Sequence, residues 1–114
     1  MLPRRHRLPG YRIPQLVHTG KRVKGSIATL LIGPQNQAKM PSRFAAVVPM
    51  RIAKKSVDRN RIKRLLYESL YTHLEELELG CDCIIMSDTP IQDKKLDDVQ
   101  PLITQLLKNA RFIQ

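Results

Sequence analysis

The longest periodic pattern of the chain runs through residues 53–79. At about 100° per residue, one side of this stretch carries mostly apolar side chains and the other carries charged ones. The pattern predicts an amphipathic helix with Asp58 or Ser56 as its N-cap and an end at about Leu79. The inner side consists of Ile62, Leu65, Leu66, Ser69, Leu70, His73, Leu74 and Leu77, and the outer side of Arg61, Arg64, Glu68 and Tyr71.

Segments with the composition of strands lie on both sides of this helix. Residues 21–33 are rich in apolar and β-branched side chains and predict two short strand segments or one bent strand. Residues 33–41 contain Gly and Pro without periodicity and predict the loop of a hairpin, whose returning strand is 43–48, buried on both faces near Val47. Residues 81–87 predict a central strand, which the strand–helix–strand order makes parallel to 43–48.

The two ends of the chain contain prolines that limit regular structure. A short helical turn is expected over residues 14–19, ended by Gly20 as a left-handed cap. Near the other end, Pro101 leaves the start of a last helix open. With Asp97 or Asp98 as cap, Pro101 lies in the first turn and is tolerated, whereas a start at Asp93 predicts a kink. The apolar positions of this helix are Leu96, Val99, Ile103, Leu106, Leu107 and Ala110.

The combined pattern predicts one α+β domain over residues 1–114, with a roughly four-stranded sheet and two or three helices. Residues 1–12 are basic and rich in proline, and we expect this tail to be ordered only where the rest of the chain holds it. Cys81 and Cys83 alternate along a strand, which predicts two reduced thiols rather than a disulfide.

Charge divides the chain into a basic front and an acidic back. The net charge is +10, but residues 1–64 hold 16 Lys and Arg against one acid, and residues 65–114 hold 4 against 9. Such asymmetry indicates a nucleic-acid partner. An anionic membrane surface is the alternative polyanion, but no apolar run approaches the ~20 residues that span a bilayer. The chain starts without an apolar signal core, so we expect a cytoplasmic protein.

The cations concentrate at the start of the central helix. That end carries the positive pole of the helix dipole, so added positive charge there is unfavourable unless an anion binds. A merely solvated basic face does not explain this placement. The cations are Lys54, Lys55, Arg59, Arg61, Lys63 and Arg64, with Asn60 among them as a neutral donor and acceptor.

Side chains for catalysis by the protein itself are sparse. The three histidines are scattered, and His73 is expected to be a hydrogen-bonded core residue. No glycine-rich phosphate loop occurs. A protein-only nuclease would need a carboxylate cluster, for which the sequence offers only Asp82, Asp88, Asp93, Asp97 and Asp98. Tyr67 and Tyr71 on the helix flank could stack on a base.

Residues 57–65, Val-Asp-Arg-Asn-Arg-Ile-Lys-Arg-Leu, closely resemble the Arg-Asn-Arg signature of the bacterial ribonuclease P protein subunit. The Leu-Pro-Arg start, Arg7-Leu8 and the run 20–23 resemble the same family. The resemblance implies a ribosomal protein S5 domain 2-like fold with a left-handed β-α-β crossover, a departure from the usual right-handed rule. It also implies an RNA-binding subunit of an endoribonuclease, which helps a catalytic RNA remove the 5′ leader from precursor tRNA.

The resemblance assigns roles by position. Arg59, Asn60, Arg61, Lys63 and Arg64 match the signature that contacts the catalytic RNA, and Lys54 and Lys55 resemble part of the same basic surface. A leader-binding cleft is expected to involve Ile13, Val17, Leu31, Phe44 and Arg51. Catalysis is expected from the RNA and the Mg²⁺ that it binds, with no cofactor bound by the protein alone and no obligate protein partner.

The chain departs from the family in the predicted cleft. Relatives have an Asp-Phe pair and a second aromatic residue in the first helix, where this chain has Ile13, Pro14, Val17 and His18. An aliphatic side chain replaces an aromatic one near Leu31, and 50–52 replace a Ser-Lys-Lys run. We therefore expect either that aliphatic contact and Arg51 hold the leader more weakly, or that the RNA partner does more of the work. The alternative function is a ribosomal or general structured-RNA-binding protein.

Overall fold

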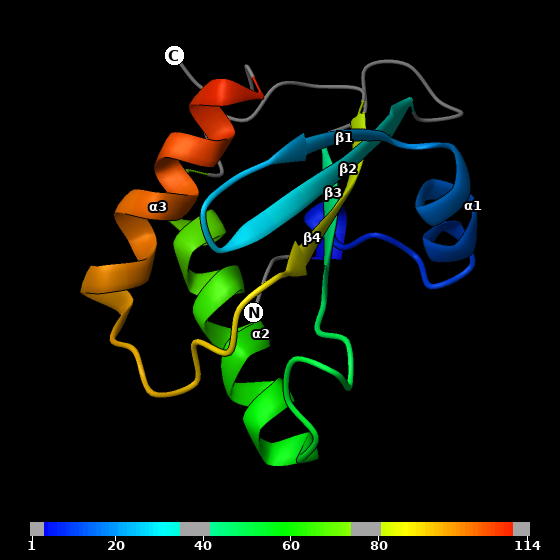
Figure 1. Ribbon diagram of the computed structural model, residues 1–114. Helices are drawn as coiled ribbons and strands as arrows, with labels where there is room; N and C mark the ends of the chain where they lie inside the picture. The colour runs from blue at the N-terminus through cyan, green and yellow to red at the C-terminus, as the bar shows by residue number, and fades with distance from the viewer. Residues whose placement is uncertain (1–3, 35–41, 74–80, 111–114) are drawn as a thin grey trace.

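A mixed four-stranded sheet lies between one helix on one face and two helices on the other (Figure 1). The computed structural model describes residues 4–34, 42–73 and 81–110. Its elements are a short 3-10 helix η1 (Arg4–His6), α1 (Arg12–Thr19), β1 (Lys21–Lys24), β2 (Ala28–Pro34), β3 (Arg43–Val47), α2 (Ser56–Tyr71), β4 (Cys81–Ser87) and α3 (Leu96–Asn109).

The strand order is β1-β2-β4-β3. β1 and β2 form an antiparallel hairpin, so residues 21–33 are two strands and not one bent strand. β4 pairs antiparallel with β2 and parallel with β3, which confirms both its central position and its predicted parallel partner. The handedness of the β3–α2–β4 crossover stays a prediction.

The predicted hairpin between β2 and β3 is wrong. These strands are not neighbours, because β4 lies between them and pairs with both. β4 has four consecutive buried residues, 82–85, which is typical of a strand in the middle of a sheet that is covered on both faces. Part of the predicted loop, residues 35–41, lies outside the described residues.

Alternation along the strands builds two cores. Cys83 and Ile85 of β4 pack toward α2 and α3, whereas Ile84 and Met86 face α1. The larger core, on the side of α2 and α3, contains the inner side of the predicted central helix: Ile62, Leu66 and Leu70 are all at 0% exposure. The smaller core consists of Leu8, Leu16, Leu31, Ala45 and Ile84.

The first helix is longer than predicted and ends differently. Pro14 is its third residue, where the missing N–H removes no intrahelical bond. Gly20 has φ −68° and ψ 145°, so the predicted left-handed cap is wrong and the chain passes directly into β1. Glycine is needed here for space, since a Cβ would lie 2.6 Å from the carbonyl oxygen of Leu16.

The caps predicted for the central helix are also wrong. α2 starts at Ser56 after Lys55, whose side chain makes no capping bond, and Asp58 lies inside the first turn. A negatively charged carboxylate in the first turn still interacts favourably with the helix dipole. α2 ends at Tyr71 and a turn follows, and residues 74–80, which include the predicted end, lie outside the described part of the chain.

Neither predicted start of the last helix is correct. α3 begins at Leu96, after Lys95 in the N-cap position, and continues through Pro101 to Asn109. Pro101 is the sixth helical residue and is exposed, as is Asp97, whose carbonyl oxygen it deprives of an N–H partner. Water can therefore satisfy this oxygen, which explains why a proline is tolerated in the second turn.

Both edges of the sheet are covered or charged. At the β3 edge, the Leu8 N–H donates to the carbonyl oxygen of Phe44 at 2.9 Å, and the Ala46 N–H donates to the hydroxyl of Tyr67 at 2.9 Å. His6 Nδ1 lies 2.9 Å from the carbonyl oxygen of Ser42. The described part of the N-terminal segment is thus held against β3. The β1 edge carries exposed Lys and Arg, which oppose strand addition.

Candidate nucleic-acid interface

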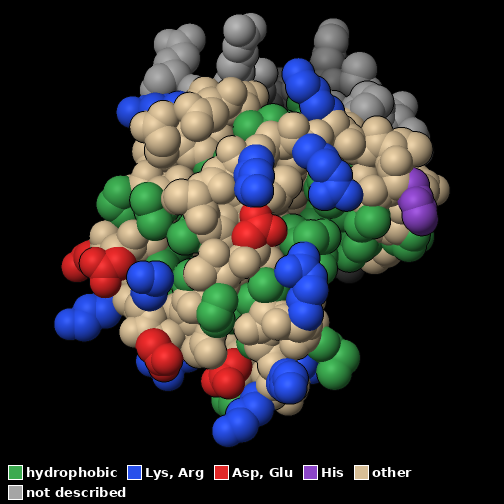
Figure 2. Space-filling view, in the orientation of Figure 1, with side chains coloured by type: hydrophobic (Ala, Val, Ile, Leu, Met, Phe, Trp, Pro, Cys, Tyr) green, Lys and Arg blue, Asp and Glu red, His purple; other side chains and the backbone are tan. Residues whose placement is uncertain are grey.

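Lysine and arginine side chains gather over the strands and at the N-terminal end of α2, while acidic side chains lie around the start of α3 (Figure 2). The charge division of the sequence is therefore only partial in space, because carboxylates also lie among the cations of α2. We call the first of two candidate surfaces the α2 basic surface. Its members are exposed or half-buried: Lys54, Lys55, Asn60, Arg61, Lys63 and Arg64.

Arg59 belongs to the same segment but has a second role. Its Nη1 donates to the carbonyl oxygens of Ala53, at 3.1 Å, and Lys54, at 2.7 Å. These bonds fasten the connection after β3 to the first turn of α2. Arg59 was predicted only as an RNA contact, and its bonds to the backbone could not be read from the sequence.

The start of α2 is well suited to an anion. Lys54 and Lys55 precede the helix and are exposed, and the N-cap side chain makes no bond to the first-turn N–H groups. Unbonded N–H groups and the positive pole of the dipole favour a phosphate at this position. A bound polyanion would thus relieve the repulsion that the cations create.

A hollow of about 430 Å³ lies along the outer side of α2. Seven of its lining residues come from α2, and the eighth, Lys94, comes from the loop before α3. Lys94 is 30 positions from Arg64 and lies in the acidic half of the sequence, so no periodicity or local charge run pointed to it. The α2 members are Val57, Asp58, Asn60, Arg61, Arg64, Leu65 and Glu68.

The second candidate surface is the face of the sheet next to α1, which we call the sheet surface. Half-buried apolar side chains lie here on the smaller core: Ile13, Val17, Val47 and Met86. Arg22 is paired with Leu31 and Lys24 with Thr29 in the β1–β2 register, which places both cations on this same face. Sequence reasoning missed Val47 and Met86 as surface residues, although strand alternation was a usable signal.

Two residues of the predicted leader cleft do not line the sheet surface. Phe44 is 1% exposed and packs in the core on the side of α2 and α3, and Leu31 is 0% exposed in the smaller core. Their side chains are used for packing, so in this structure they are not exposed for the predicted contacts with a leader. Ile13 and Val17 are half-buried on the expected face, and Arg51 is exposed in the turn between β3 and α2.

A buried ionic cluster fixes α1 to the sheet. Asp82, at 0% exposure, accepts from Arg12 Nε at 2.9 Å and from Arg43 Nε and Nη2 at 2.8 and 2.7 Å. Arg12 also donates to the side chain of Gln15. The hydrogen bond to Asp82 is the main reason that the pKa of Arg43 is raised above its ordinary value. The Arg43 guanidinium therefore remains charged beside the carboxylate of Asp82.

The other side chains considered for chemistry have structural roles. Asp88 accepts from Thr29 Oγ1 at 2.6 Å, and His73 Nε2 lies 2.8 Å from Thr104 Oγ1. Tyr67 is bonded to β3 and half-buried, so it is not placed for stacking, whereas Tyr71 is 57% exposed. In residues 4–34, 42–73 and 81–110, no three His, Cys, Asp or Glu side chains form a group that could hold a metal ion.

Neither cysteine forms a disulfide, as predicted. Cys83 is buried at 0% exposure, and this burial raises the pKa of its thiol well above the ordinary 9.0. Cys81 is half-buried at the start of β4.

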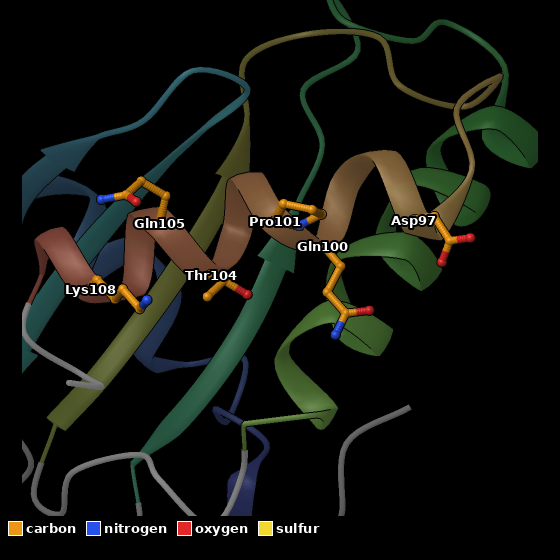
Figure 3. Close-up of a pocket in the computed structure, with 6 residues that line it drawn as sticks. All are labelled: Asp97, Gln100, Pro101, Thr104, Gln105 and Lys108. Atoms are coloured by element: carbon orange, nitrogen blue, oxygen red, sulfur yellow. The ribbon is translucent and has the colours of Figure 1, made fainter.

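A second hollow, of about 410 Å³, follows one side of α3 (Figure 3). Gln100 Nε2 donates to Thr72 Oγ1 at 3.1 Å, and Thr104 contacts His73, so these side chains join α3 to the end of α2. Asp97 and Lys108 contribute opposite charges. The hollow therefore lacks the excess of cations that characterises the α2 basic surface.

These features define an α+β nucleic-acid-binding protein with a basic helix start and a basic sheet face. A protein-family model named Ribonuclease P matches residues 2–111. The chain therefore belongs to the ribonuclease P protein family, whose members are the protein subunit of the ribonucleoprotein that processes tRNA 5′ ends. Among the described residues, none of the helices combines the length and apolarity needed to cross a bilayer.

Relatives and solved structures agree with this assignment. A ribonuclease P protein component from Microcystis aeruginosa is 38% identical over 115 residues, covering 98% of this chain and 96% of its own. One from a Picosynechococcus strain is 31% identical over 85 residues, with 74% and 72% covered. The RNase P proteins of Staphylococcus aureus (TM-score 0.79, 20% identity, 96% and 98% covered) and Thermotoga maritima (0.75, 20%, 90% and 94%) share the fold.

Proposed function

We propose that this protein binds the catalytic RNA of ribonuclease P through the α2 basic surface and the precursor-tRNA leader through the sheet surface. The observation that carries the proposal is the concentration of cations at the positive pole of α2, beside a first turn without a side-chain cap. Phosphates are the groups that arginine forks and helix N-termini bind best. The geometry thus supports contact with a structured RNA backbone.

The sheet surface supports a weaker, apolar contact with the leader. Val17 and Met86 offer aliphatic area, and Arg22 and Lys24 lie on the same face for phosphates. Aromatic stacking platforms, which strengthen single-strand binding, do not occur among these side chains. We therefore propose that this chain holds the leader less tightly than an aromatic cleft would.

Catalysis in this proposal belongs to the RNA and the Mg²⁺ that it binds. The buried Asp82 is already bonded to two arginines, and among the described residues no group of three His, Cys, Asp or Glu side chains could hold a metal ion. The protein contributes cations that screen phosphate repulsion between the two RNAs, which lowers the Mg²⁺ concentration needed for activity. A cytoplasmic location belongs to the same proposal.

The decisive experiment is precursor-tRNA cleavage at low Mg²⁺ with protein alone, bacterial-type ribonuclease P RNA alone, and both together. We expect cleavage at the mature 5′ end chiefly in the mixture. Metal-dependent cleavage by the protein without RNA would instead revive a protein-only nuclease. Tight binding to many structured RNAs without stimulation would favour a ribosomal or general RNA-binding protein.

A further inference from the structure

Lys94 lies beside the outer side of α2 although it belongs to the acidic half of the chain. It lines the hollow of about 430 Å³ together with Arg61 and Arg64. Its backbone is fixed, because Ile91 is fully buried and accepts a hydrogen bond from the Lys94 N–H at 2.9 Å. The loop before α3 thus presents one cation at a constrained position next to the α2 basic surface.

The other lining groups say what the hollow can bind. Asp58 and Glu68 add two carboxylates, and Val57, 68% exposed, and Leu65 add apolar area. A site for a bare anion would not contain two carboxylates, since these repel it. A strand of RNA carries phosphates, which the cations can bind, and ribose hydroxyls, which can donate hydrogen bonds to the carboxylates.

We propose that this hollow binds a ribose–phosphate segment of the RNA partner, with Arg61, Arg64 and Lys94 on phosphates and Asp58 and Glu68 on hydroxyl groups. The inference rests on the proposed function and extends it, because it adds the loop before α3 to the RNA-binding surface. The RNA would then contact two separate parts of the chain that pack side by side.

The chain contains a matched control for this idea. Lys95 is the next residue, is exposed and has the same charge, but it does not line the hollow. We compare Lys94→Ala with Lys95→Ala for binding to a bacterial-type ribonuclease P RNA over a series of salt concentrations. Lys94→Ala should raise Kd about fivefold at low salt and reduce the salt slope by about one, and Lys94→Arg should restore both. Lys95→Ala should bind like the wild type.

Equal losses in both Ala variants would mean that net charge alone matters, which overturns the inference. Arg61→Ala separates it from the proposed function. If Arg61→Ala weakens RNA binding and Lys94→Ala binds like the wild type, the Lys94 contact is excluded and the proposed function is retained. If both variants bind like the wild type, both the Lys94 contact and the proposed function are excluded. Thermal unfolding checks each variant, and Lys94→Gln, which keeps much of the aliphatic stem, replaces Lys94→Ala if the latter is less stable.

Discussion

Asp82 is the residue on which the position of α1 depends most directly. Its carboxylate is fully buried and bonded to one arginine from α1 and one from β3. Asp82→Asn would leave two guanidinium groups facing a neutral amide, and removal of one partner from a buried ionic cluster costs about 3 kcal/mol. We expect this loss in the free energy of unfolding, measured by urea denaturation.

Asp88→Asn is the control for that substitution. Asp88 is half-buried just after the end of the same strand and accepts a side-chain hydrogen bond from Thr29, so the loss of this bond should cost only about 1 kcal/mol. Equal effects of the two substitutions would show that the cluster around Asp82 adds nothing beyond a single hydrogen bond.

The two thiols should differ sharply in reactivity. Cys83 is buried in the larger core and its pKa is raised well above 9.0, so the reactive thiolate is scarce in the folded protein. A thiol reagent at pH 8 should label Cys81 first and Cys83 only on unfolding, with Cys81→Ser as the control that leaves one slow site. Rapid labelling of both residues in the native protein would contradict the burial of Cys83.

The same pKa shift predicts a dependence of stability on pH. When folding raises the pKa of a group, that group contributes its full stabilisation at pH values below its pKa in the unfolded state. This stabilisation is lost as the pH rises toward the pKa in the folded state. The difference in free energy of unfolding between the wild type and Cys83→Ala should therefore narrow above pH 9.0, the ordinary value for this thiol. A constant difference from pH 7 to 10 would mean that the thiol ionises equally in both states.

At the scale of single elements, α2 combines a structural and a binding role in neighbouring arginines. Arg59 bonds two carbonyl oxygens of the preceding connection, while Arg61 is exposed and lines the hollow. Arg59→Ala should lower both stability, by about 1 kcal/mol, and RNA affinity, whereas Arg61→Ala and Arg64→Ala should lower affinity and flatten its salt slope with folding nearly intact.

Chemical denaturation and RNA binding of the same variants distinguish these roles. Loss of folding in Arg61→Ala would make that side chain structural. Unchanged stability in Arg59→Ala would mean that its two backbone bonds merely replace bonds to water.

The buried side of α2 and the position of β4 in the sheet could be predicted because their sequence patterns are strong and local. The buried positions of α2 followed from helical spacing, and the parallel pairing of β4 followed from its order after a helix. Caps and ends could not be predicted, because they depend on groups that only the fold brings together. Gly20 illustrates this, since its role is a close approach to Leu16 and β2 and not a left-handed turn.

At the scale of the whole molecule, the sequence showed where charge is concentrated along the chain, but it did not show which residues share a surface. Phe44 and Leu31 were placed in a cleft by their position in the resemblance, whereas the register of the sheet turns Phe44 toward α2 and α3 and covers Leu31. Lys94 lies next to the α2 basic surface only because the tertiary fold brings the loop before α3 to α2. Long-range placement of this kind depends on strand order, and the order β1-β2-β4-β3 departed from the predicted hairpin.

The sheet surface provides a test of the whole assembly, because leader binding matters only when the protein, the RNA and the precursor are together. Val17→Ser and Met86→Ser remove aliphatic area from this surface and leave the α2 basic surface unchanged. In the holoenzyme, we expect each to lower kcat/KM for a precursor with a long leader by about fivefold, equivalent to ~1 kcal/mol of apolar burial, and to spare a precursor with a single leader nucleotide.

Leu102→Ser is the matched control, since Leu102 is an exposed apolar residue on α3, which packs on the other face of the sheet. It should leave both precursors unaffected. An equal loss on long and short leaders in the Val17 and Met86 variants would point to impaired assembly with the catalytic RNA, because binding of the protein to that RNA does not depend on leader length. Unchanged kinetics on both precursors, with the variants folded and bound, would exclude the sheet surface as the leader contact and leave the α2 basic surface as the region through which the protein acts.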